Sequence, residues 1–229
     1  MDLTALGLFI VSLILSLGAQ ILVQSSFNRY SRQAAQSGYS GFQTARRLLD
    51  QNGLTQVAIE PVRGQLTDHF SPRENILRLS ESTYGSPSVA AIGVAAHETG
   101  HALQHRDGYW PNKIRASLLL PANIGSQAGP FLAGIGLIMQ SAFGDMLAQV
   151  GILLFSGAVL FYLVTLPVEF NASRRALTLL SESGILSAQE MKGARSVLRA
   201  AALTYVASAM TALLYLLRYI GMANSRRRR

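Results

Sequence analysis

The chain has 229 residues, of which 49% are hydrophobic and 14% are charged, and its formal net charge is +8. Soluble domains carry about 25% charged residues, so the low charged fraction and the long apolar runs predict an integral membrane protein. The lack of cysteine excludes disulfides and thiolate metal ligands. Arginines cluster beside the apolar runs, which favours the headgroups of the lipid bilayer, and no nucleic acid, as the partner of the positive charge.

The first apolar run, residues 3–23, carries no charge and is long enough to cross a bilayer, which takes roughly 20 residues. A secretory signal peptide is the alternative. It is disfavoured because no basic residue precedes the run and residues 24–27 make a poor cleavage site. We therefore predict a retained transmembrane helix, followed by a polar linker over residues 25–41.

Short elements follow the linker. Residues 41–52 have the pattern of an amphipathic helix. Residues 56–62 predict a strand that Pro61 keeps at a sheet edge, residues 66–72 are rich in turn formers, and residues 75–80 alternate like a second strand. An extended peptide could pair with a free edge of this sheet, or the second strand could merely cover the next helix.

A His-Glu-x-x-His motif follows this strand. His97 and His101 are four residues apart, so on a helix they leave the same face, where two neutral imidazoles can share one Zn²⁺. Glu98 can take a proton from a water molecule that the metal has acidified. The motif therefore predicts metal-assisted peptide hydrolysis with one Zn²⁺ per chain.

The residues around the motif favour this interpretation over two solvated histidines on a surface helix. Residues 89–96 are small and apolar, as in a buried helix. We expect Ser86 to cap this helix, Pro87 to occupy its first position, and residues 107–108 to end it.

The second half of the chain is dominated by further apolar segments. Residues 118–139 are long enough to span but carry two prolines and several polar residues, which predicts a kinked helix. Residues 146–168 are a cleaner span, continued by a polar helix over residues 169–177. A capping box at residues 187–190 starts the last helix, which is apolar over residues 200–217.

A catalytic zinc site needs a third protein ligand and an open coordination position. Glu169 is the favoured third ligand because it directly follows a membrane span that returns the chain to the side that carries His97. A structural glutamate that caps a helix after Pro167 is the alternative.

Other residues are weaker candidates for the site. Asp107 has the spacing of a third ligand in a second peptidase class, but that class needs a glycine where this chain has Gln104. His105 lies one helical turn too far along to join the first pair, so we place it at the surface or beside the site. His69 either contacts the substrate or the rim of the site, or is an ordinary loop histidine. His69 and Tyr84 are candidate donors to the oxyanion, and Tyr84 is equally well explained as a core residue.

The two motifs, residues 94–102 and 166–177, resemble the YugP-type membrane zinc metallopeptidases of bacteria, and the resemblance covers the whole chain. The second motif is also similar to the Glu-x-x-Ala-Asp element of gluzincins such as the HtpX-type and CAAX prenyl proteases. The likeness implies that Glu169 is the glutamate ligand. Ser173 stands where those enzymes have an aspartate that orients a ligand histidine. Ser173 would do this more weakly, or Asn171 or another carboxylate would replace it.

These elements predict a mainly α integral membrane protein with about four transmembrane helices. A small α+β zincin-like catalytic region places a short sheet beside the His-Glu-x-x-His helix. The regions are transmembrane helix 1 (1–24), the catalytic region (25–112), a hairpin of transmembrane helices 2 and 3 (113–168), the third-ligand helix with the start of the last helix (169–199), and transmembrane helix 4 with a basic tail (200–229).

The expected function is that of a zinc metalloendopeptidase that hydrolyses protein substrates near the membrane surface, with a zinc-activated water and Glu98 as general base. The substrate is expected to be a membrane-associated protein or peptide, and an oligomer or a partner membrane protein is compatible with the sequence. The positive-inside rule predicts a bacterial cytoplasmic (inner) membrane with the active site on the cytoplasmic side, although four spans then leave the basic tail outside. The alternatives are a non-catalytic zinc-binding membrane scaffold or partner subunit, and a basic membrane-surface adaptor.

Overall fold

The computed structural model describes residues 3–139 and 141–227. The chain divides into two compact units, which we describe separately. The helical unit comprises residues 1–18, 110–167 and 205–229, and the sheet unit comprises residues 19–109 and 168–204.

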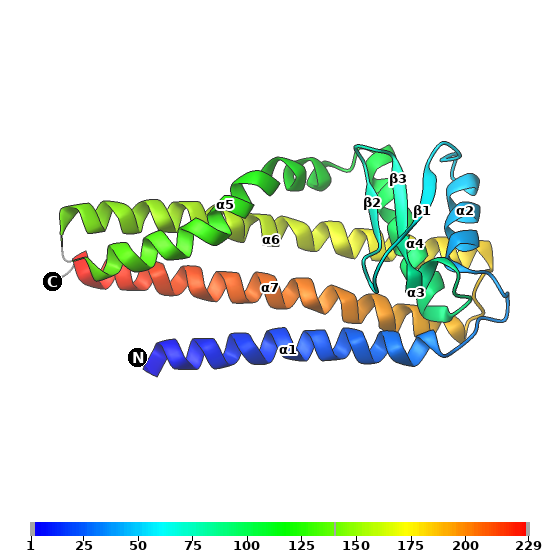
Figure 1. The fold of residues 1–229 in the computed structure, drawn as a ribbon, viewed down its shortest axis with the longest axis horizontal. Helices are drawn as coiled ribbons and strands as arrows, with labels where there is room; N and C mark the ends of the chain where they lie inside the picture. The colour runs from blue at the N-terminus through cyan, green and yellow to red at the C-terminus, as the bar shows by residue number, and fades with distance from the viewer. Residues whose placement is uncertain (1–2, 140, 228–229) are drawn as a thin grey trace. The chain divides into compact units, whose positions relative to one another are not determined.

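The architecture is mainly helical, with one small sheet, as the sequence predicts (Figure 1). The helices are α1 (Leu3–Ser31), α2 (Gly41–Gln51), α3 (Glu81–Tyr84), α4 (Val89–Arg106), α5 (Trp110–Ile138), α6 (Ala142–Ser183) and α7 (Glu190–Arg227). The strands are β1 (Ala58–Val62), β2 (His69–Ser71) and β3 (Ile76–Ser80).

Three helices in the described part of the chain are long and apolar enough to cross a membrane, namely α1, α6 and α7. The expected fourth span is not confirmed. Its residues form α5, a helix of 29 residues that contains Pro121 and Pro130, but the prolines and polar residues dilute its apolar character. A membrane crossing by α5 therefore stays a prediction.

The helical unit packs α5 closely against α6. Gly129 of α5 has no room for a side chain, because a Cβ atom there would lie 2.8 Å from the Cβ of Phe155. At the carboxyl end of α5, the Arg226 guanidinium donates to the carbonyls of Gly136 (2.9 Å) and Leu137 (3.3 Å). Arg226 thus satisfies carbonyl groups that a helix end leaves without partners.

The sheet unit contains a three-stranded sheet in the order β1-β3-β2. β1 runs parallel to β3, whereas β2 pairs with β3 in antiparallel register, with Phe70 opposite Leu77. The sequence pattern missed β2, which lies in the segment expected to be turns. The Asp68 carboxylate accepts hydrogen bonds from the N–H and hydroxyl of Ser80, both at 2.8 Å, and so fixes the approach of the segment before β2 to the end of β3.

The core of the sheet unit lies between the sheet, α2, α4 and the end of α6. Its fully buried members include Leu48 and Leu49 of α2, Leu77 of β3, Ile92 of α4 and Leu180 of α6. The amphipathic pattern of α2 predicted this inward face correctly. The core holds α4 against elements from distant parts of the sequence.

Two expected boundaries were wrong. The first part of the predicted polar linker is helical, up to Ser31. Burial of Phe27 against Ala90 and Val197 stabilises this extension of α1. The cap of α4 is Ser88 rather than Ser86: the Ser88 hydroxyl accepts from the N–H of Ala91 at 3.2 Å.

The physical reason for the later start of α4 is a short strand-like pairing before it. The N–H of Ala35 donates to the carbonyl of Pro87 at 2.8 Å, and the N–H of Val89 donates to that of Gln33 at 2.9 Å. These bonds keep residues 87 and 88 extended, so Pro87 cannot serve as the first helical residue.

Candidate metal centre

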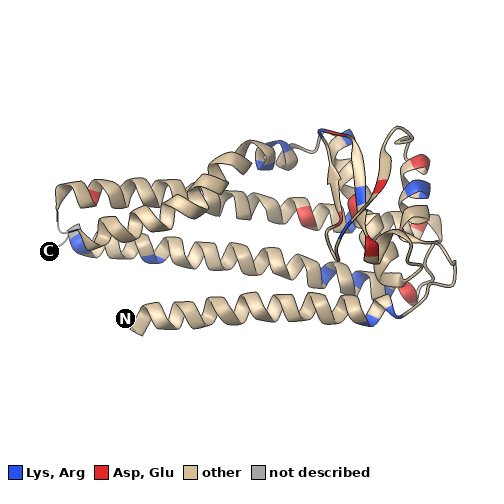
Figure 2. Ribbon diagram, viewed as in Figure 1, with Lys and Arg blue, Asp and Glu red and all other residues tan. Residues whose placement is uncertain are grey.

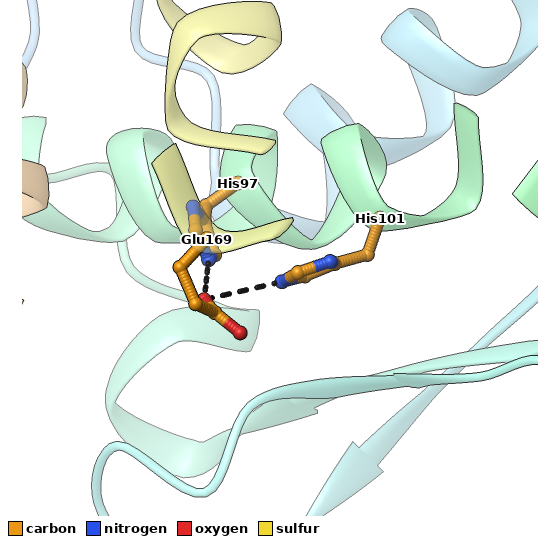
Figure 3. A group of neighbouring side chains, drawn as sticks. All are labelled: His97, His101 and Glu169. Atoms are coloured by element: carbon orange, nitrogen blue, oxygen red, sulfur yellow. Dashed lines mark hydrogen bonds and ion pairs between the residues drawn. The ribbon is translucent and has the colours of Figure 1, made fainter. Parts of the chain in front are cut away.

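The candidate site lies in the sheet unit, between α4 and the carboxyl-terminal part of α6. His97 and His101 project from consecutive turns of α4, and Glu169 projects from α6 (Figure 3). The Oε2 atom of Glu169 lies 3.3 Å from Nε2 of His97 and 3.5 Å from Nε2 of His101. The donor atoms of these three residues all lie within 4.8 Å of one another. The structure thus brings together two imidazoles and one carboxylate that are far apart in sequence.

Gly100 allows α4 and α6 to approach this closely. A Cβ atom at Gly100 would lie 2.6 Å from the carbonyl oxygen of Ala172 and 3.2 Å from its Cα. These are backbone atoms of a helix, so they cannot move aside without displacing it. The glycine between the two histidines of the motif is therefore required for Glu169 to reach the pair.

The orientation of His101 is set by Gln104, which sequence reasoning had not assigned to the site. The amide nitrogen of Gln104 donates to the carbonyl of Val168 (2.8 Å) and to Oδ1 of Asn171 (3.0 Å). Both amide hydrogens point toward acceptors, so the Gln104 oxygen, 3.0 Å from Nδ1 of His101, accepts a hydrogen bond from that ring nitrogen. The Nε2 lone pair of His101 then faces Glu169.

Ser173 holds the other ring. Its hydroxyl oxygen lies 3.1 Å from Nδ1 of His97, one turn of α6 beyond Glu169. A hydroxyl that accepts from Nδ1 leaves Nε2 of His97 available as a ligand. The resemblance to gluzincins suggests Ser173, Asn171 or another carboxylate for this role. In the structure Ser173 contacts His97, whereas Asn171 contacts Gln104 and supports His101 indirectly.

A chain of polar contacts continues from Asn171 to the surface. The Arg175 guanidinium donates to Oδ1 of Asn171 at 2.9 Å and to Oδ2 of Asp107 at 2.5 Å. Arg106 donates to the other oxygen of Asp107 at 2.8 Å. Hydrogen bonds from Arg106 and Arg175 lower the pKa of Asp107 below its ordinary value. Asp107 thus accepts hydrogen bonds from two arginines and links the end of α4 to α6. It does not belong to the donor group of His97, His101 and Glu169.

The donor set fits zinc. Catalytic zinc sites use three protein ligands of histidine and carboxylate type and keep a further position open. Histidine ligands in such sites donate their other ring nitrogen to a hydrogen-bond acceptor, and Gln104 and Ser173 stand at those positions here. His97, His101 and Glu169 are therefore the residues that would hold the ion.

Comparisons with known proteins agree with this chemistry. Residues 5–224 match the model of a family described as "Putative neutral zinc metallopeptidase". The chain belongs to this family. A curated relative from Bacillus subtilis (strain 168), named "Putative membrane protease YugP", is 47% identical over 213 residues, which are 93% of each chain. No solved structure matches the chain significantly.

For a member of a zinc metallopeptidase family, the residue next to the first histidine is of interest. Glu98 follows His97 on α4 and is buried, with 7% of its surface exposed. A carboxylate that follows the first histidine of the motif is a candidate for a general base.

The weaker candidates lie outside the donor group of the described residues. His69 is exposed, and its Nδ1 atom lies 2.9 Å from the carbonyl of Thr67. The ring of His105 packs against that of Phe70, with 5.9 Å between centroids. Tyr84 packs against Phe42 at 5.1 Å, which favours the core interpretation for this tyrosine.

Proposed function

We propose that this protein is a membrane-embedded, zinc-dependent endopeptidase that hydrolyses peptide bonds of protein substrates near the membrane surface. One observation carries the proposal: the donor atoms of His97, His101 and Glu169 lie within 4.8 Å of one another. Glu98, which follows His97 in the sequence, is buried. This combination supports the proposal because it has the composition of a gluzincin ligand set with its glutamate base.

Each residue has a separate role in the proposed reaction. His97, His101 and Glu169 hold the ion, and Gln104 and Ser173 keep the two imidazoles oriented. Zinc, when bound, polarises the scissile carbonyl and acidifies a water molecule. Glu98 accepts a proton from the attacking water and delivers it to the amine nitrogen as the peptide bond breaks.

The membrane-surface substrate follows from the position of Glu169 in the sequence. Residues 146–166, which precede it on α6, are almost entirely apolar, so the third ligand lies at the end of a candidate span. We propose membrane proteins or their juxtamembrane segments as substrates.

Because basic residues surround the site in the sequence, we also propose a bacterial inner-membrane location with the site on the cytoplasmic side. Cleavage of the sheet unit by added protease only from the periplasmic face would contradict this orientation.

The decisive test measures metal and activity on the detergent-purified full chain. Wild type should contain about one zinc per chain, and Glu169→Ala should lose it. Glu182→Ala is the matched control, because Glu182 is an exposed glutamate on the same helix. Zinc retained by Glu169→Ala would exclude Glu169 as the third ligand.

The role of Glu98 is tested separately. Glu98→Gln should keep zinc and lose hydrolysis of a membrane-protein substrate by a factor on the order of 10²–10⁴. Hydrolysis at the wild-type rate by Glu98→Gln would contradict its role as base. If the wild-type protein binds zinc but cleaves none of a panel of membrane proteins, the result would favour the alternative of a non-catalytic zinc-binding scaffold.

A further inference from the structure

A cluster of positive charge lies in the sheet unit, where the end of α1 faces the beginning of α7. None of its residues belongs to the candidate metal centre. Arg29 of α1 and Lys192, Arg195 and Arg199 of α7 line a groove with a volume of 660 Å³. All four side chains are exposed, and Figure 2 shows the basic residues at these ends of the two helices.

On the helices that carry these cations, the one acidic residue in the described range is Glu190, at the first position of α7. Residues 3–31 and 191–227 contain no aspartate or glutamate. Glu190, at the start of α7, already accepts from the N–H of Gln36 at 2.7 Å and from the N–H of Ser187 at 2.8 Å. Within the described residues no ion pair neutralises the groove, so it attracts an anion.

The walls of the groove are held in place by packing between α1 and α7. The hydroxyls of Ser26 and Ser196 lie 3.2 Å apart. Gly193 accommodates the ring of Tyr30, since a Cβ atom there would lie 2.7 Å from Cδ1 of that ring. The lining also includes Ser25, whose hydroxyl donates to the carbonyl of Leu22 at 3.1 Å. In the Ser26–Ser196 pair one hydroxyl donates to the other, which leaves the second one able to donate to an oxygen atom of a ligand.

The groove changes from polar to apolar along its length. At the end opposite Lys192 and Arg29 it is lined by Leu22, Leu203 and Ala200. Leu22 and Leu203 are large apolar side chains with 51% and 45% of their surfaces exposed. Both helices are long and apolar enough to cross a membrane, so we expect this end of the groove to face the acyl region of a bilayer.

We propose that this groove is a binding site for an anionic phospholipid. The phosphate lies among the arginines, Lys192 and the serine hydroxyls, and an acyl chain lies along Leu22 and Leu203. Basic pockets between transmembrane helices bind lipid headgroups in this way. A soluble anion would satisfy the cations but would leave the two leucines exposed. The site is separate from the metal centre, and the proposal does not depend on the proteolytic function.

The proposal is tested by native mass spectrometry of the detergent-purified full chain with phosphatidylglycerol or with phosphatidylcholine that has the same acyl chains. Wild type should retain phosphatidylglycerol in preference. The double variant Arg195→Gln/Arg199→Gln should bind it more weakly by on the order of tenfold or more. The control Arg63→Gln/Arg73→Gln removes the same charge from exposed residues of the sheet unit outside the groove and should bind like wild type. Equal loss in both double variants, or no preference in wild type, would overturn the proposal.

A second measurement on the wild type does not depend on the folding of a variant. A photoactivatable phosphatidylglycerol should crosslink to residues 22–30 and 192–203, and inorganic phosphate should not displace it at millimolar concentration. Crosslinks only elsewhere on the chain would overturn the site. Displacement by inorganic phosphate would overturn the lipid as its occupant, in favour of a soluble anion.

Discussion

Gln104 holds the ring of His101 from one turn further along the same helix, with 3.0 Å between the amide oxygen and Nδ1. The side chain of Gln104 is fully buried and donates to Val168 and Asn171 of α6. One amide group therefore both selects the imidazole tautomer and joins the helix that carries two proposed ligands to the helix that carries the third. The orientation of His101 depends on the packing of α4 against α6.

Substitution of Gln104 tests this dependence. Gln104→Ala removes the acceptor for Nδ1 of His101, so we expect zinc affinity to fall by about 10–100-fold. The variant should also unfold more easily by about 1–3 kcal/mol, because the hydrogen bonds from the buried Gln104 amide to the Val168 carbonyl and to Asn171 are lost. Zinc affinity is measured by competition with a chelator, and Gln51→Ala, at an exposed glutamine of α2, is the control. Wild-type affinity in Gln104→Ala would refute the positioning role.

Ser173 offers a test in both directions. Ser173→Ala leaves Nδ1 of His97 without the hydroxyl 3.1 Å away, and we expect about a tenfold loss of zinc affinity. Ser173→Asp supplies a carboxylate, which accepts from an imidazole N–H more strongly than a hydroxyl does, so its affinity should equal or exceed that of wild type. If the alanine and aspartate variants bind zinc equally well, the contact with His97 has no part in metal binding.

Gly100→Ala tests the close approach of α4 and α6. The added Cβ would meet the backbone of Ala172, so the helices must separate. We expect a loss of about 1–3 kcal/mol of stability together with weaker zinc binding.

Gly93→Ala on the same helix is the control for Gly100→Ala, because its Cβ would sit 3.4 Å from the Cβ of Ala194, an ordinary contact. Alanine favours helix over glycine by about 1 kcal/mol, so this control should melt at or above the wild-type temperature. Equal melting temperatures for the two variants would contradict the steric argument.

Asp107 predicts a pH dependence of stability. Its pKa is lowered in the folded protein, first by the hydrogen bond from Arg106 and then by that from Arg175. A lowered folded-state pKa contributes stability that is fully present above the ordinary value of 3.8 and is lost as the pH falls through the lowered pKa. The melting temperatures of the metal-free wild type and of Asp107→Asn should therefore differ at neutral pH and converge as the pH falls below about 4. A difference that is constant with pH would show that the carboxylate charge contributes nothing.

The site could be anticipated from sequence to the extent that its residues follow a motif. The spacing of His97 and His101 predicts one helix face, and Glu169 stands out as an acidic residue directly after an apolar run. The structure places these three residues together, whereas their role as ligands stays a prediction. Gln104 was missed because a glutamine has no motif of its own. Its burial three residues after His101 is evident only once α6 is packed against α4.

In the fold too, features set by local sequence patterns could be predicted, whereas features set by long-range contacts could not. The capping box at residues 187–190 and the amphipathic face of α2 are local patterns, and both are present in the structure. β2 has three residues and is defined by its pairing with β3, so no local periodicity reveals it. The pairing of Ala34 with Ser88 shifts the start of α4, and this contact joins segments that no sequence pattern relates. Errors therefore occurred where a long-range contact decides a local conformation.

The separation of the site's residues along the chain has a consequence for biosynthesis. His97 and Glu169 are 72 positions apart. At a synthesis rate of 5–20 residues per second, the ribosome needs about 4–14 seconds to add the intervening residues. Throughout that interval the nascent chain carries the histidines and Glu98 but lacks the last donor. The complete donor group of His97, His101 and Glu169 can therefore form only after α6 has been synthesised and has packed against α4.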